Sequence, residues 1–300
     1  MNDARANPKS RFPIRRLGIG VICGCLFCVS CFRLDSILFW PDPVDEYFRP
    51  ADMDSAWHTR GVVPDSLREE VRLFPAPGET TFGFFARALP DTVPAPTVIY
   101  SHGNAGNING YWNRVELLWE AGCNVFIYDY EGFGKSEGTP SGEACYADAE
   151  SALAYVLARP DVVDSNVVYY AWSLGSFMAC HLAADVRSPR CLILENPMVS
   201  MSALAKEGAV LGIPGSFVVD ADFDNETRIP LVGCRTLIIY GKIDDTAVPE
   251  RNALVLLDKA NPSTTKGYPI EGANHSDVPE VMGHDEYERV VKAFIAGDSL

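Results

Sequence analysis

A serine at the end of a predicted strand is the residue of this chain best placed to act as a nucleophile. Ser173 follows the apolar, β-branched and aromatic run 167–172, and a helix-compatible segment begins directly after it. The residues two positions before and after it are small, Ala171 and Gly175, as a sharp turn that lifts a hydroxyl out of the backbone requires. The usual pattern has glycine in place of Ala171, and a serine in such a turn can also be only an N-cap. Ser173 is therefore a candidate nucleophile whose partners must come from elsewhere in the chain.

The base that such a serine needs would be one of five histidines. His275 follows the last predicted strand in a glycine-containing loop, from which it could reach Ser173. It would accept the serine proton as general base and then donate it to the leaving group as general acid. The other histidines lie before the domain, in the loop of another strand, within a predicted helix and at a helix start: His58, His102, His181 and His284. We therefore predict that His275 is the base.

A carboxylate that orients the histidine and stabilises its imidazolium is expected at another strand end. Two adjacent aspartates follow the predicted strand 236–240, in a loop one residue longer than the common form. The position of the acid can be counted from either end of this loop. Counting forward from Gly241 favours Asp244, whereas counting back from Val248 and Pro249 favours Asp245. We predict Asp245 as the acid, with Asp244 as the alternative. The unused aspartate would be an acidic residue near a helix N-terminus, where the helix dipole favours it.

The loop after the predicted strand 97–101 contains Gly103 and Gly106, and glycines allow backbone N–H groups to turn inward. An acyl-transfer enzyme needs two such donors for the oxyanion that develops during the reaction. We assign them to the backbone N–H groups of Asn104 and of Leu174, the residue after the serine. An ordinary β–α turn and a phosphate-binding loop are the alternatives, although the glycine spacing matches neither dinucleotide nor Walker patterns.

The elements that must position these residues are alternating apolar runs and helix-like segments. The predicted strands are 70–74, 81–88, 97–101, 124–128, 166–171, 191–195, 236–240 and 265–270. The predicted helices are 111–120, 143–157, 174–184, 201–211, 251–259 and 286–296. This alternation predicts an α/β fold with a mostly parallel sheet of about eight strands flanked by helices. Ligands of such sheets bind beyond the carboxyl ends of the strands, and the roughly 40 residues between 195 and 236 favour a short cap.

The composition fits one folded domain and argues against several function classes. The chain has 300 residues, of which 47% are hydrophobic and 22% are charged, enough for a domain of about 250 residues with a large core. The net charge of −15 consists of +5 over residues 1–33 and −20 over the rest. An acidic body without a cluster of lysine and arginine does not suit nucleic acid. The cysteines beyond residue 33 form no C-x-x-C pair, which argues against zinc, and the chemistry above requires no metal and no cofactor.

The first 32 residues have the character of a targeting segment. Basic residues precede the uncharged run 17–32, the pattern of a secretory signal or a signal anchor. Val29, Ser30 and Cys31 resemble the end of a bacterial lipoprotein cleavage site, and a buried N-terminal helix is the alternative. We predict a signal peptide or anchor at 1–32, an α/β domain at 33–300, and a membrane-associated or exported protein with that domain on the non-cytoplasmic side.

Three loops carry motifs that match a known family. They are the segments 101–107 (Ser-His-Gly-Asn-Ala-Gly-Asn), 128–138 (Tyr-Asp-Tyr-Glu-Gly-Phe-Gly-Lys-Ser-Glu-Gly) and 272–275 (Gly-Ala-Asn-His). With these loops the chain resembles the α/β-hydrolase family, and in particular a branch that includes membrane-anchored protein depalmitoylases and lipid hydrolases. The order of Ser173, the aspartate and His275 along the chain is also the order of that family.

The resemblance and the ordered residues together predict a serine hydrolase that cleaves carboxylic ester or thioester bonds. The expected partner is a small-molecule or lipid acyl substrate, or an acylated protein, with membrane association through the N-terminal segment and no nucleic acid. A peptidase of the same fold and a non-catalytic binding module on a hydrolase scaffold are the alternatives.

Overall fold

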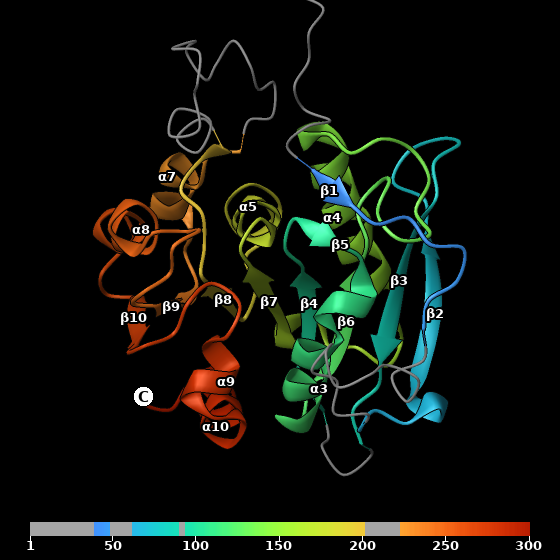
Figure 1. Ribbon diagram of the computed structural model, residues 1–300. Coiled ribbons are helices and arrows are strands. Elements are labelled where there is room, and N and C mark those ends of the chain that lie inside the picture. Colours follow the sequence, from blue (N-terminus) through green and yellow to red (C-terminus); the bar gives the residue numbers. More distant parts are fainter. Residues whose placement is uncertain (1–38, 49–61, 90–93, 202–222) are drawn as a thin grey trace, which may run out of the picture.

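The chain is organised around one eight-stranded sheet with helices on both faces (Figure 1). The computed structural model describes residues 39–48, 62–89, 94–201 and 223–300. The strand order is β10-β9-β8-β7-β4-β6-β3-β2. The bounds are β2 (Arg68–Leu73), β3 (Thr81–Ala86), β4 (Thr97–Ser101), β6 (Asn124–Tyr128), β7 (Val167–Trp172), β8 (Cys191–Glu195), β9 (Arg235–Gly241) and β10 (Thr265–Ile270). A separate two-stranded sheet pairs β1 (Trp40–Pro41) with β5 (Ala105–Gly106).

The strands from β10 to β6 are parallel, whereas β3 and β2, at the other side of the sheet, pair antiparallel. Every residue of β4, β6 and β8 is buried, which explains why these strands are almost continuously apolar in sequence: a parallel sheet is covered on both faces. The hairpin of β2 and β3 joins this core through antiparallel pairing of β3 with β6. Strand β2 lies at the edge and exposes part of its length.

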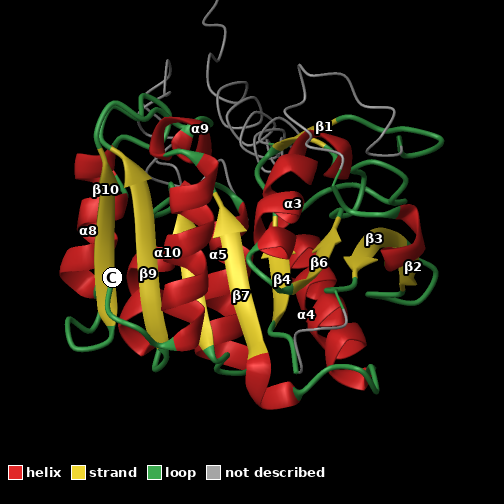
Figure 2. Cartoon of the chain, turned by 90° about the horizontal axis from the view of Figure 1, so that it is seen from below, coloured by secondary structure: helices red, strands yellow, loops and turns green. Residues whose placement is uncertain are grey.

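Two helical layers bury the two faces of the sheet (Figure 2). One core cluster contains side chains of α4, α5 and α8, and the other contains side chains of α3 and α10. The bounds are α3 (Trp112–Glu120), α4 (Gly142–Ala158), α5 (Gly175–His181), α7 (Asn225–Arg228), α8 (Ala253–Lys259), α9 (Val278–Met282) and α10 (His284–Ala296). Helix α10 packs the apolar face that contains Tyr287, Val291 and Phe294 against this core, as an amphipathic helix does.

The predicted fold class is confirmed, and most elements lie where the sequence places them. Four strands begin and end as predicted, and the other four differ by at most two residues at an end. The predicted helix 174–184 is divided into α5 and a π-helical turn at Leu182–Val186. Most of the predicted helix 201–211 and the centre of the predicted cap lie within 202–222, outside the described residues, as does the predicted targeting segment 1–32. Over the part of the chain that is described, no helix is both long and apolar enough to cross a membrane.

The register of the parallel strands brings the chemistry-bearing loops to one edge. Ser101 at the end of β4 is paired with Ala171 near the end of β7, and Glu195 at the end of β8 is paired with Trp172. Ile270 at the end of β10 is likewise paired with Gly241 at the end of β9. The loops after these strands therefore begin side by side at the carboxyl edge of the sheet, where parallel α/β folds bind ligands.

Candidate active site

Ser173 occupies the sharp turn between β7 and α5. Its φ is 54°, a left-handed conformation that is uncommon for a residue other than glycine, and its backbone N–H donates to the carbonyl of Glu195 at 3.0 Å. A Cβ at Gly175 would lie 1.9 Å from the carbonyl oxygen of Ser101, so helix and strand approach as closely as the sequence predicts. Ala171 is fully buried within β7, and the turn forms with alanine in place of the usual glycine.

A continuous series of hydrogen bonds joins Ser173, His275 and Asp244. The Oγ of Ser173 lies 2.9 Å from Nε2 of His275, and Nδ1 of His275 lies 2.8 Å from Oδ2 of Asp244. Because a carboxylate only accepts hydrogen bonds, Nδ1 carries the proton, and Nε2 is left to accept from the serine hydroxyl. This is the tautomer that a general base at Nε2 requires.

The prediction that Asp245 pairs with the histidine is wrong, because Asp244 occupies that position. Oδ1 of Asp244 accepts from the backbone N–H groups of Thr246 and Ala247, both at 2.8 Å, which leaves Oδ2 for His275. Asp245 is exposed, and its own N–H donates to Oδ1 of Asn274 at 3.1 Å. The extra residue of the loop is accommodated after Asp244. The acid is therefore the aspartate that is reached by counting forward from Gly241 at the end of the strand.

Of the remaining histidines, two have ring nitrogens that contact groups other than the serine. His102 is fully buried, with Nδ1 2.8 Å from the carbonyl of Gly103 and Nε2 3.0 Å from Asp129. Nε2 of His181, the last residue of α5, lies 2.8 Å from Oε1 of Glu150. His284 begins α10, and His58 lies outside the described residues.

The loop after β4, which is predicted to supply an oxyanion donor, is held by hydrogen bonds to other segments of the chain. The carbonyl of Asn104 accepts from the N–H of Trp40, and the N–H of Ala105 donates to the hydroxyl of Tyr111 at 3.1 Å. Leu174 is fully buried directly after Ser173. Since β4 and β7 are adjacent, the N–H groups of Asn104 and Leu174 belong to neighbouring strand ends. Their role as oxyanion donors stays a prediction.

Two large apolar side chains differ in position, since Met198 lies at the site and Trp112 lies in the core. The Sδ of Met198 lies 3.8 Å from the Oγ of Ser173, so an apolar group lies beside the serine. Trp112, in contrast, is buried in the core against Phe84, with 5.7 Å between ring centroids. Glu195, Asn196 and Arg114 were not predicted as site residues. The only signal for Glu195 in the sequence is a carboxylate at the end of an otherwise apolar buried strand.

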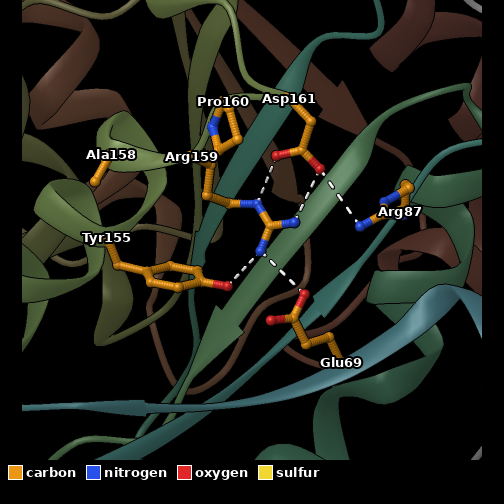
Figure 3. A pocket seen from close by; sticks show the side chains of 7 residues that line it. All are labelled: Glu69, Arg87, Tyr155, Ala158, Arg159, Pro160 and Asp161. Carbon is orange, nitrogen blue, oxygen red and sulfur yellow. Dashed lines mark hydrogen bonds and ion pairs between the residues drawn. The ribbon is translucent and has the colours of Figure 1, made fainter.

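A shallow hollow elsewhere on the surface is not a candidate site (Figure 3). At its centre Arg159 donates to Asp161 at 2.9 Å and to Glu69 at 3.1 Å, and Asp161 also pairs with Arg87. Arg87 follows the last residue of β3, which is paired near the amino end of β6. The hollow therefore lies at the amino ends of the parallel strands, whereas Ser173 lies at their carboxyl ends. Its charges neutralise one another. Within the described ranges, no group of three His, Cys, Asp or Glu side chains could hold a metal ion.

The eight-stranded sheet and the serine, histidine and aspartate at its carboxyl edge define the α/β-hydrolase class. Comparisons with known proteins agree. A sequence model of the family described as serine aminopeptidase S33 matches residues 92–232. The uncharacterized protein YfhR of Escherichia coli O157:H7 is 32% identical over 226 residues, which cover 73% of each chain. The chain therefore belongs to the α/β-hydrolase family, the hydrolases built on this fold.

A further relative and a solved structure of similar fold show how far the likeness extends. Human alpha/beta hydrolase domain-containing protein 17B is 31% identical over 206 residues, which cover 67% of this chain and 66% of that protein. The esterase Pf2001 of Pyrococcus furiosus has a solved structure with a TM-score of 0.66 and 18% identity, covering 86% of this chain and 98% of that one. At that identity the second likeness concerns the fold alone.

Proposed function

We propose that the protein is a serine hydrolase that cleaves carboxylic ester or thioester bonds. The observation that carries the proposal is the hydrogen-bonded series of Ser173, His275 and Asp244, with separations of 2.9 and 2.8 Å. Each member comes from a different loop at the carboxyl edge of the sheet. A core-packing role would not require a serine in a left-handed turn aimed at an imidazole.

In the first half of the reaction, the Oγ of Ser173 attacks the acyl carbonyl carbon while Nε2 of His275 takes the hydroxyl proton. Asp244 holds the imidazole through Nδ1 and stabilises the imidazolium that forms. Collapse of the tetrahedral intermediate breaks the bond to the leaving alcohol or thiol, which receives the proton from Nε2. The acyl group remains bound to the serine.

In the second half, His275 activates a water molecule that attacks the acyl-enzyme and restores the free serine. We assign stabilisation of the oxyanion in both halves to the backbone N–H groups of Asn104 and Leu174. Loss of one such donor typically costs about two to three orders of magnitude in rate. The steps use only groups of the chain and water, so the proposal calls for no metal and no cofactor.

The proposed substrate is a small-molecule or lipid acyl compound, or an acylated protein. The thioether of Met198, 3.8 Å from the serine oxygen, supports an acyl chain over a polar group at that point. Pf2001, a protein of similar fold, is described as an esterase. We also propose that residues 1–32 direct the protein to a membrane or out of the cytoplasm, because a basic start precedes an uncharged run there.

A peptidase is the second candidate, favoured by the match to the serine aminopeptidase family. The same three residues serve amide hydrolysis, so the two proposals differ in the leaving group. Paired substrates with one acyl group, an activated ester and the corresponding anilide, separate them. We expect the ester to be cleaved and the amide to be left intact.

Replacement of the nucleophile tests the proposal directly. We expect Ser173→Ala to abolish hydrolysis of a short-chain activated ester while the protein keeps its fold. Ser263→Ala, in an exposed turn, is the matched control and should retain full activity. Full activity of Ser173→Ala would mean that the serine is not the nucleophile.

A further inference from the structure

The loop that carries His275 is held by side chains from outside the loop. The backbone carbonyl of His275 accepts from the indole N–H of Trp172 at 3.0 Å and from Nδ2 of Asn196 at 2.8 Å. The same amide of Asn196 also donates to the carbonyl of Asn274 at 3.2 Å. Two consecutive carbonyls of the histidine loop are therefore bound by residues at the ends of β7 and β8.

A buried ion pair holds the next carbonyl of the loop. Nη2 of Arg114 donates to the carbonyl of Ser276 at 3.0 Å and to Oε1 of Glu195 at 2.6 Å. The hydroxyls of Tyr170 and Tyr287 both donate to Oε2 of Glu195, each at 2.6 Å. The side chains of Arg114 and Glu195 are 3% and 0% exposed. A pair at this depth is retained only where its remaining hydrogen bonds are well satisfied, as they are here.

These contacts form one connected unit. The guanidinium of Arg114 lies 4.3 Å from the centre of the Trp172 ring, an arrangement that favours cation–π attraction. Asn196 has a φ of 43°, a conformation that asparagine tolerates better than most residues, and its Oδ1 accepts from the N–H of Gly241 at 2.8 Å. We refer to Arg114, Trp172, Glu195 and Asn196 as the histidine clamp.

We propose that the histidine clamp is a set of positioning residues that fixes the His275 backbone, so that the imidazole stays between Asp244 and Ser173. This inference rests on the proposed function. The clamp binds backbone carbonyls of the loop, whereas the reacting atoms are at the far end of the imidazole. A displacement of about 1 Å in a catalytic group can cost roughly a hundredfold in rate, and the separations of 2.8 and 2.9 Å on either side of the imidazole leave little room for one.

The sharpest test replaces one indole N–H. Trp172→Phe keeps an aromatic ring for Arg114 but removes the bond to the His275 carbonyl. Trp119→Phe is the matched control, because the indole of Trp119 donates to the carbonyl of Arg87 at 2.7 Å, far from the site. We expect Trp172→Phe to lower kcat on an activated ester about tenfold with KM changed less than about twofold. The control should match wild type in both constants.

Two results would overturn the positioning role. The first is a kcat that is equal in the two tryptophan variants, whether both keep or both lose activity. The second is a raised KM with unchanged kcat, which would place Trp172 against substrate. Asn196→Gly, which keeps the left-handed backbone accessible, provides the test if Trp172→Phe does not fold, and it should also lower kcat rather than raise KM. An inactive wild-type protein would refute the proposed function instead, so the two failures are distinguishable.

Discussion

The two adjacent aspartates provide a prediction in which a displacement of one residue decides the result. Asp244→Asn should lower kcat by about four orders of magnitude, whereas Asp245→Asn should leave it within about twofold. A loss of this size corresponds to roughly 5 kcal/mol of activation free energy. Both substitutions remove one negative charge and almost no volume, so each is the control for the other.

The magnitude follows from the hydrogen bonds of Asp244. Its Oδ1 accepts two backbone N–H groups at 2.8 Å, so an asparagine would keep its oxygen there and direct its NH₂ group at His275. The reverse orientation would place the NH₂ group of the asparagine against the backbone N–H groups of Thr246 and Ala247. Each group left without an acceptor would cost about 1–3 kcal/mol. Facing an NH₂ group, Nδ1 of the histidine must accept, and the proton moves to Nε2. The imidazole then cannot take the proton of Ser173.

The assay is steady-state hydrolysis of a short-chain activated ester by both variants, together with their thermal unfolding. Asp245 is exposed and makes no contact with His275 among its described hydrogen bonds, so its loss should affect neither measurement strongly. A large loss of kcat in Asp245→Asn together with an active Asp244→Asn would refute the assignment of Asp244. The acid would then be Asp245, the residue reached by counting back from Val248 and Pro249.

Three other outcomes follow from the same structure. Gly175→Ala should prevent folding or reduce soluble yield sharply, since a Cβ there meets a backbone carbonyl at 1.9 Å; a soluble variant with wild-type melting temperature would contradict the close approach. Met198→Ala should shift ester preference toward bulkier acyl groups, as measured by kcat/KM over a chain-length series, and an unchanged preference would remove Met198 from the acyl site. Burial, with a hydrogen bond and the charge of Glu79, raises the pKa of Glu131 from 4.5 to about 7. Because the folded state then holds this proton more tightly than the unfolded state, stability falls as pH rises from about 4.5 to 7. Glu131→Gln should therefore melt higher than wild type at pH 8 and no higher near pH 4, and a variant that melts lower at pH 8 would contradict this.

The sheet was predictable from sequence because its strands are buried on both faces. β4, β6 and β8 are short, apolar and bounded by polar or glycine-containing loops, and no other element fits such runs in an alternating chain. Strand β1 and its partner β5 escaped prediction, since each has two residues and forms only through pairing between distant segments. Local sequence carries no signal for such a contact.

The site was predictable as far as strand ends determine it. Ser173 directly follows β7 and His275 lies in the loop after β10, two strands whose ends the sequence predicts to within one residue, and the structure brings the two side chains together. The aspartate was misassigned because the loop after β9 is longer than usual, and the backbone bonds that select Asp244 form only in the folded loop. Glu195 was missed for a related reason: its ion-pair partner Arg114 lies 81 residues earlier in the chain, and sequence alone does not pair them.

Covalent labelling of the wild-type protein by a fluorophosphonate probe, with mass mapping of the modified peptide, tests the central claim most directly. The probe reacts with a serine that an adjacent base activates. We predict a single adduct on Ser173, with labelling slowed strongly in Asp244→Asn and retained in Asp245→Asn. A protein that stays unlabelled, or that carries its adduct on another serine, would contradict the assignment of Ser173 as the nucleophile.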